Sequence, residues 1–83
     1  MSFKIAFKKS VERVLKKLDK DQADRILAKI DEELPYKAQA FPLLSGEFSG
    51  LREFRVGDDR VIHSIIGDTA LILRISHRRE AYR

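Results

Sequence analysis

Cysteine is absent from the 83 residues, and no hydrophobic run is long enough to cross a membrane. Without cysteine, the chain forms no disulfide and no thiolate metal site. The N-terminus also lacks the apolar stretch of a secretory signal peptide. These absences predict a small cytoplasmic protein without a membrane partner. Its single domain, residues 1–83, lies near the lower size limit for a self-sufficient hydrophobic core.

Several motifs of metal and covalent chemistry are missing as well. No pair of histidines or carboxylates has the spacing of metal ligands, and neither a glycine-rich phosphate loop nor a nucleophile elbow is present. The stretch GEFSG, residues 46–50, contains two glycines but lacks the strand-to-helix context of such motifs. We therefore expect no metal and no cofactor.

Lysine is absent from residues 50–83, although the chain carries a net charge of +4. All eight lysines and two of the arginines lie in residues 1–49. The second part contains seven arginines: Arg52, Arg55, Arg60, Arg74, Arg78, Arg79 and Arg83. Because the guanidinium fork suits phosphate and stacks on bases, this distribution predicts an anion site. The alternative is a set of surface salt bridges with neighbouring acidic residues.

Apolar spacing predicts the element order β-α-α-β-β-β. Residues 2–7 alternate as a short strand, and residues 11–18 place apolar side chains on one face of a helix. A second helix carries an apolar stripe from Ala23 to Leu34, with Asp19 as its N-cap and Gln22 three residues later, as in a capping box. Pro35 is expected to end this helix, because the residue before proline is driven out of helical conformation.

The apolar pattern in the second half of the chain predicts three strands in a meander. The three residues 57–59 and the pair Gly67–Asp68 have the composition of hairpin turns. One helical hairpin then packs on one face of a small, mainly antiparallel sheet, which is an α+β fold. The other face is left for solvent or a partner.

Alternation sorts the side chains of the meander between these two faces. The following residues are expected to face the helices: Phe54, Val56, Val61, His63, Ile65, Leu71, Leu73 and Ile75. The arginines Arg55, Arg60 and Arg74 then project together from the other face, which favours phosphate binding over the salt-bridge alternative. His63 is predicted to be a core histidine and not a catalyst, whereas His77, among arginines, is open to either interpretation.

The segments LREFRVGDDRVIHSI and ILRISHRREAYR resemble the signature of RelE-type toxins of the RelE/ParE superfamily. The match comprises the core L-x-x-x-R-V-G-D-x-R, a hydrophobic last strand and the ending H-R-(R/K)-(E/D)-x-Y. The resemblance implies a RelE-like fold similar to that of microbial ribonucleases. It also implies the toxin of a type II toxin–antitoxin system, a ribosome-dependent and metal-independent endoribonuclease that cleaves mRNA in the ribosomal A site. The implied partners are the ribosome, mRNA and a cognate RelB-like antitoxin.

The resemblance also assigns roles to single residues. Arg55 and Arg60 are expected against the mRNA backbone, Arg78 at the scissile phosphate, and Tyr82 as a base-stacking or proton-transferring group. Further RNA contacts are expected from Arg52, Arg74, His77 and Arg79. Two positions depart from the family's frequent residues, because Asp59 replaces an aromatic residue and His63 replaces a tyrosine. At the position of Glu53 the family often has a basic residue, although a glutamate also recurs there. Asp59 is expected to add a negative charge beside Arg60.

Two other functions fit the same sequence. ParE-type relatives share the fold but poison gyrase, and the ending HRREAYR argues against that mode. A non-catalytic RNA-binding module would use the arginines only to neutralise phosphates. Cleavage products from translating ribosomes, or gyrase-dependent DNA breaks, would discriminate between these possibilities.

Overall fold

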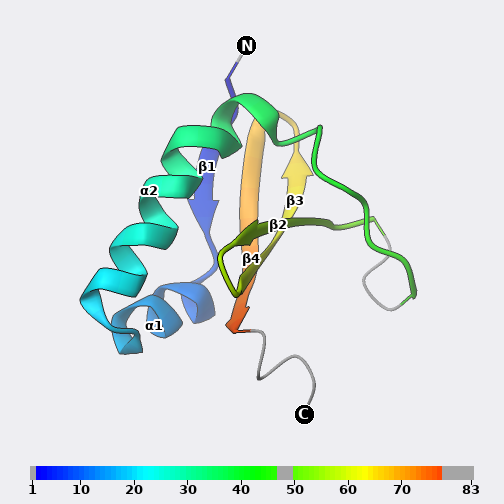
Figure 1. Cartoon of the computed structure of the whole chain (residues 1–83). Helices are drawn as coiled ribbons and strands as arrows, with labels where there is room; N and C mark the ends of the chain where they lie inside the picture. Colours follow the sequence, from blue (N-terminus) through cyan, green and yellow to red (C-terminus); the bar gives the residue numbers. More distant parts are fainter. Residues whose placement is uncertain (1, 47–49, 78–83) are drawn as a thin grey trace.

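The computed structural model describes residues 2–46 and 50–77, and its elements follow the predicted order. They are β1 (Lys4–Phe7), α1 (Lys9–Lys17), α2 (Lys20–Lys37), β2 (Arg52–Val56), β3 (Asp59–Ile66) and β4 (Thr69–His77). The strands form one sheet in the order β1-β4-β3-β2, in which only the β1–β4 pair is parallel. Both helices lie on the same side of the sheet (Figure 1), so the predicted α+β architecture is confirmed. Neither described helix is long and apolar enough to cross a membrane.

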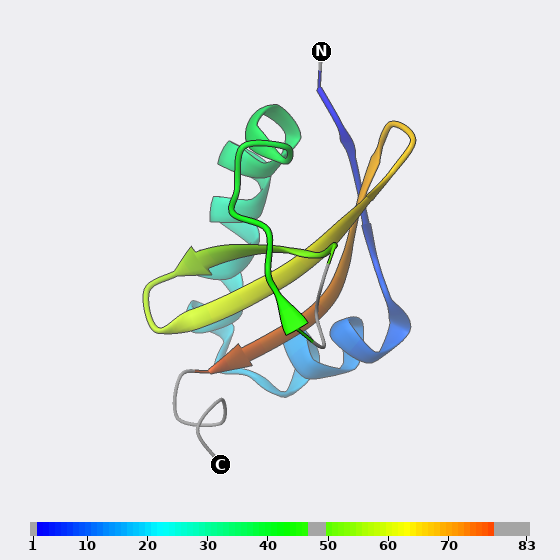
Figure 2. The same ribbon diagram turned by 90° about the vertical axis from the view of Figure 1, so that its right-hand side faces the viewer.

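The hydrophobic core lies between α2 and the sheet. Ile26, Ile30 and Leu34 recur at a spacing of four along α2, and all three are fully buried. They belong to one cluster with Val61 of β3 and Ile72 of β4. The alternating residues of the first strand also pack against this cluster, as predicted: Phe3, Ile5 and Phe7. Figure 2 looks from the right-hand side of Figure 1 and shows the twisted sheet in front of the helices.

Helix α2 does not end before Pro35, as the sequence predicted, but continues to Lys37. Leu34 and Ala38, on either side of this turn, are both fully buried. Their burial offsets the helical hydrogen bond that proline cannot donate. The carbonyl oxygen of Pro35 accepts a hydrogen bond of 2.7 Å from the backbone N–H of Phe3. Tertiary packing therefore extends the helix beyond its local stop signal.

A β-bulge in β4 changes the alternation that the sequence suggested. His63 of β3 pairs with Ile72 and Ile62 pairs with Arg74, so the intervening Leu73 is the extra residue. The core residues of β4 are consequently Ala70, Ile72 and Ile75. The predictions for Leu71 and Leu73 were wrong, because a regular two-residue period cannot describe a strand that contains an extra residue. After the bulge, Arg74 faces away from the core and Ile75 faces into it.

Both hairpins turn at a glycine with left-handed backbone geometry. Gly57 and Gly67 each have a φ of 59°, a conformation that other residues rarely adopt. Val56 pairs with Asp59, so the first turn contains two residues, one fewer than predicted. The second turn consists of Gly67 and Asp68, as predicted, because Ile66 pairs with Thr69.

The bulge can be tested by comparing two alanine substitutions. Ile72→Ala should lower the free energy of unfolding by about 2–5 kcal/mol, because it leaves a cavity in the core. Leu73→Ala should cost only about 1 kcal/mol, because Leu73 is half-buried at the bulge. Equilibrium unfolding in urea, followed by circular dichroism, measures both values. A larger loss for Leu73→Ala would contradict the bulged register and restore the regular alternation.

Candidate functional site

Three arginines project from the face of the sheet opposite the helices. Arg55 of β2 pairs with Arg60 of β3, and Arg74 of β4 pairs with Ile62, the second residue after Arg60. Arg55 and Arg74 are exposed, and the Arg60 side chain is 34% exposed. We call the surface formed by these three arginines and Glu53 the arginine face. The register agrees with the predicted placement of the three arginines on one side.

Glu53 lies between two of these arginines. Its Oε1 accepts a hydrogen bond of 2.7 Å from Nε of Arg55 and lies 3.4 Å from Nε of Arg60. Its side chain is only 12% exposed, so the carboxylate is held within the surface. A carboxylate shared by two guanidinium groups reduces their mutual repulsion and fixes their orientation. Because Arg55 is 70% exposed, solvent screens its pair, and we expect a larger effect on orientation than on stability.

The arginine face lies where the chain leaves the sheet. Ser76 pairs with Arg60, and His77, the last residue of β4, pairs with Asp59. The backbone of His77 therefore ends β4 next to the Arg55–Arg60 pair. The predicted site residues Arg78, Arg79 and Tyr82 follow in the sequence but lie outside the described residues, so their roles stay predictions.

Arg52 is not part of the arginine face. It pairs with His63 on the helix side, and its Nη1 donates a hydrogen bond of 2.7 Å to the carbonyl oxygen of Phe41. The backbone of Arg52 also forms a β-bridge with Leu43. Arg52 thus ties the loop after α2 to the edge of β2. The structure does not bring it together with Arg55 and Arg60, and its predicted RNA contact stays a prediction.

His63 is a core residue, as the sequence predicted. It is fully buried, and its Nε2 lies 3.1 Å from the carbonyl oxygen of Ala38, which identifies Nε2 as the donor. Its Nδ1 has no hydrogen-bond partner among the described residues. Burial lowers the pKa of His63 below its usual 6.5, the hydrogen bond to Ala38 opposes this shift, and the charge of Arg52 adds to it. A neutral histidine suits this position.

Asp59 faces the helices and not the arginine face. Its side chain is buried, and both carboxylate oxygens accept hydrogen bonds of 3.1 Å from Nε2 of Gln22. The sequence predicted that Gln22 belongs to a capping box and that the charge of Asp59 lies beside Arg60. Instead, Asp19 caps α2 without a side-chain hydrogen bond, and Gln22 joins the start of α2 to β3. This long-range pair had no local signal in the sequence.

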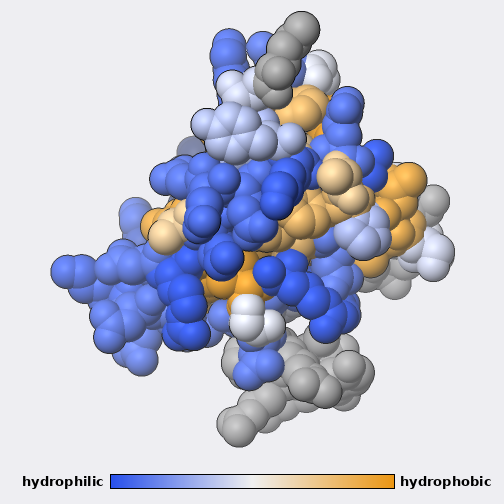
Figure 3. Space-filling view, turned by 45° about the horizontal axis from the view of Figure 1, so that its top comes forward, coloured by the Kyte–Doolittle hydropathy of each residue, from blue (hydrophilic) through white to orange (hydrophobic). Residues whose placement is uncertain are grey.

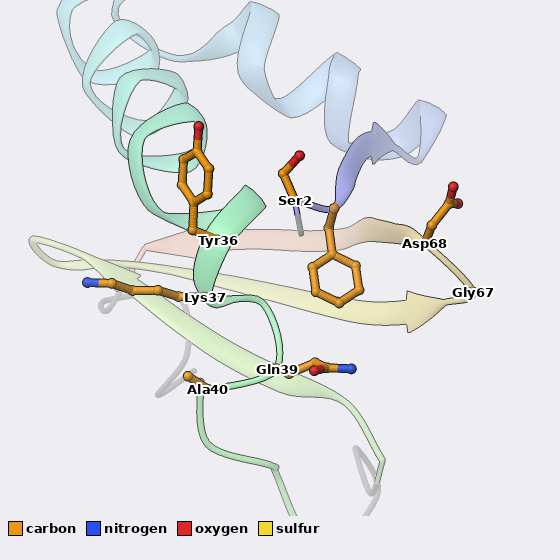
Figure 4. Close-up of a pocket in the computed structure, with 8 residues that line it drawn as sticks. Ser2, Tyr36, Lys37, Gln39, Ala40, Gly67 and Asp68 are labelled. Carbon is orange, nitrogen blue, oxygen red and sulfur yellow. The ribbon is translucent and has the colours of Figure 1, made fainter.

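An open pocket of about 690 Å³ lies at the other end of the sheet (Figure 4). Tyr36 and Lys37 reach it from the end of α2, and Asp68 reaches it from the β3–β4 turn, where it pairs with Lys4 at 3.6 Å. The turn follows the end of β3, whereas Arg60 lies at its beginning, so this pocket is remote from the arginine face. Within the described ranges, no three histidine or acidic side chains are placed to hold a metal ion.

Comparisons with known proteins identify relatives of the chain. The model of the ParE toxin of type II toxin–antitoxin systems, parDE, matches residues 5–82. The chain is similar to a protein in the RelBE2 toxin–antitoxin complex of Mycobacterium tuberculosis, with 23% identity, a TM-score of 0.85 and coverage of 94% and 100% of the two chains. It is also similar to one in the RelE–RelB complex of Pyrococcus horikoshii, with 28% identity, a TM-score of 0.71 and coverage of 94% and 97%. No curated protein sequence matches it.

The stability of the protein should fall as the pH drops below 6.5. The pKa of His63 is lower in the folded protein than its value of 6.5 in an unfolded chain, so below that pH the unfolded state binds more protons. The contribution of His63 is therefore complete above pH 6.5 and is lost as the pH falls through the folded pKa. Urea unfolding between about pH 5 and pH 8, the range in which histidine titrates, measures this loss.

Substitution tests whether His63 causes this loss of stability. His63→Gln removes the titrating ring while its amide can still donate to Ala38, so the pH dependence should become flatter. Gln39→Ala, at an exposed position without a titrating group, serves as the control and should keep the wild-type dependence. If His63→Gln left the acid-induced loss unchanged, another group would be responsible for it.

Proposed function

The chain belongs to the ParE toxin family of type II toxin–antitoxin systems, and from this premise we propose that it is a ribosome-dependent endoribonuclease. Its substrate is mRNA in the ribosomal A site, so it acts in the cytoplasm and arrests translation. The observation that supports this proposal is the Arg55–Arg60 pair at the end of the sheet where the C-terminal segment begins. Paired guanidinium groups suit the phosphates of a single RNA strand.

The proposed reaction uses the 2′-hydroxyl of the RNA as its nucleophile. This hydroxyl gives its proton to water as it attacks the adjacent phosphorus, and a 2′,3′-cyclic phosphate forms. The bond to the 5′-oxygen breaks, and that oxygen takes up a proton as it leaves. Negative charge accumulates on the phosphate in the transition state, where Arg55 and Arg60 stabilise it. Because Glu53 already orients both Nε–H groups, these guanidinium groups need little rearrangement when the charge develops.

Two residues of the C-terminal segment complete the proposed site. Arg78 follows His77 directly and supports the scissile phosphate, as the resemblance to RelE-type toxins implies. Tyr82 stacks on a base or donates the proton to the leaving 5′-oxygen. Arginine remains protonated at neutral pH and is a poor base, so the in-line geometry imposed by the ribosome contributes much of the acceleration.

The family match also supports a second candidate function. ParE-type toxins act on gyrase, and the matching family model is that of the ParE toxin. The arginine face favours an RNA target, because it presents phosphate-binding groups on one continuous surface. Gyrase-dependent DNA breaks on induced expression, without new mRNA 5′ ends, would select the gyrase mode. A module that binds RNA without cleaving it would produce neither.

Loss of single site arginines should abolish most of the cleavage. Arg60→Gln and Arg78→Ala should each reduce the single-turnover rate on programmed ribosomes by about a hundred- to a thousand-fold, the typical effect of losing one transition-state donor. Tyr82→Phe should be slow if the hydroxyl transfers a proton, whereas a normal rate together with an inactive Tyr82→Ala would identify stacking. In cells, mapping of mRNA 5′ ends measures the cleavage by each variant.

Arg25→Gln is the matched control, because Arg25 is an exposed arginine of α2. It should cleave at the wild-type rate. An Arg60→Gln variant as fast as this control would show that the arginine face does not act on the phosphate. An unaffected Arg78→Ala variant would contradict the role that the resemblance gives to Arg78.

We further propose that a cognate RelB-like antitoxin covers the arginine face. The similar structures from M. tuberculosis and P. horikoshii are toxin–antitoxin complexes. A positively charged surface is neutralised best by an acidic segment that also carries apolar side chains. Such a segment would compete with RNA for Arg55 and Arg60.

The two proteins should therefore co-purify, and their affinity should fall as the salt concentration rises. The double substitution of Arg55 and Arg60 by glutamine should weaken the complex in isothermal titration calorimetry, whereas Arg25→Gln should leave it unchanged. If the wild type, the double variant and Arg25→Gln bound the antitoxin with equal affinity, the antitoxin would have to inhibit from another surface.

A further inference from the structure

A second pocket opens at the β2 edge of the sheet, beside the arginine face. Its volume is about 500 Å³, within the usual range for small-molecule sites. It is lined by Glu33 of α2, by Phe41, Pro42 and Leu44 of the following loop, and by Glu53, Phe54 and Arg55 of β2. In Figure 3, the surface over this loop is largely apolar, in contrast to the hydrophilic surface of the helices. None of the roles described so far uses this pocket.

Phe41 forms the aromatic wall of the pocket. Its ring centroid lies 4.7 Å from that of Phe54 and 6.0 Å from that of His63. These two buried rings hold Phe41 in place, while its own side chain remains partly exposed. Pro42 and Leu44 extend the apolar wall. A flat, rigid and apolar wall suits the face of a nucleobase, which gains free energy by stacking on an aromatic side chain.

Two carboxylates join Arg55 in the polar part of the lining. The Glu33 side chain is 26% exposed and lies 3.6 Å from Nζ of Lys29 and 3.7 Å from Nζ of Lys37. Glu53 reaches the pocket from the arginine face. Ionised carboxylates accept hydrogen bonds and cannot donate them. Adenine, cytosine and guanine each carry an exocyclic amino group with two N–H donors. Uracil has no amino group, and its single N3–H donor lies between two carbonyl oxygens, which repel a carboxylate.

Arg55 belongs to the arginine face and to the lining of this pocket. A phosphate at Arg55 therefore brings the base of an adjoining nucleotide to the pocket. We propose that this pocket is a nucleobase subsite, which binds the base next to the cleaved phosphate and selects amino-bearing bases over uracil. The inference rests on the proposed ribonuclease function and assigns base specificity to the same site.

The test compares base preference in four proteins: the wild type, Glu33→Gln, Phe41→Leu and the control Glu32→Gln. Glu32 is an exposed neighbour on the same helix and does not line the pocket. Programmed ribosomes present each of the four bases on either side of the cleavage point. The wild type should disfavour uracil at one of these positions by about tenfold, the discrimination expected of one well-placed polar pair.

The variants should change this preference in different ways. In Glu33→Gln the preference should largely disappear, because an amide donates as well as accepts hydrogen bonds. Phe41→Leu should slow the cleavage next to amino-bearing bases, because it removes the stacking surface. Glu32→Gln should retain the wild-type pattern. If the wild type cleaves and Glu33→Gln keeps the same base preference, the subsite is overturned while the ribonuclease function stands.

A wild type that cleaves no mRNA would refute the proposed ribonuclease function but would not test the subsite. Direct measurement of nucleotide binding tests the subsite in either case. Titration with guanosine 5′-monophosphate should shift the amide NMR signals of Phe41 and Leu44 more than uridine 5′-monophosphate does. Equal shifts, or none, would overturn the proposal. If the antitoxin shifted these signals and neither nucleotide did, the pocket would belong to the interface with the antitoxin, and the proposed subsite would also be overturned.

Discussion

The rest of the structure depends on the burial of the α2 stripe against one face of the sheet. Ile26, Ile30 and Leu34 meet the inward side chains of the strands, and this contact decides which side of each strand is apolar. Alternate positions of β2 and β3 then carry charged groups on the opposite face, beside the buried Ile62. The Arg55–Arg60 pair and Glu53 are a consequence of this division, because a sheet packed by helices on both faces would have to bury them at high cost.

The charged face is also organised locally. Arg55 and Arg60 lie directly opposite each other on adjacent strands, where like charges destabilise a sheet. Glu53 offsets this repulsion by contacting both groups from two positions earlier on β2. A basic residue at this position would add a further positive charge. In this chain, a cluster with a smaller net charge presents guanidinium groups that Glu53 already orients.

Much of this arrangement could be predicted from the sequence, because it follows from short-range patterns. The element order, the hairpin at Gly67, the burial of His63 and the side occupied by the arginines all depend on periodicity or turn composition. The bulge at Leu73, the passage of α2 through Pro35 and the Gln22–Asp59 pair depend on contacts between distant segments. Alternation places Arg52 on the helix side of β2. It could not predict the hydrogen bond to the carbonyl oxygen of Phe41, which gives Arg52 a structural role. The aromatic pocket forms only when the loop after α2 folds against the edge of β2.

The bulge at Leu73 divides β4 into two parts that differ in their pairing. Thr69–Ile72 lies between β1 and β3 and is hydrogen-bonded on both sides. Beyond the bulge, the only described strand that pairs with β4 is β3, and this part carries Arg74 and leads to His77. A strand held along one side opens at a lower free energy than one held along both. The fold thus joins a rigid base to a more compliant end, and the burial of Ile75 in the core anchors that end directly beside Arg74.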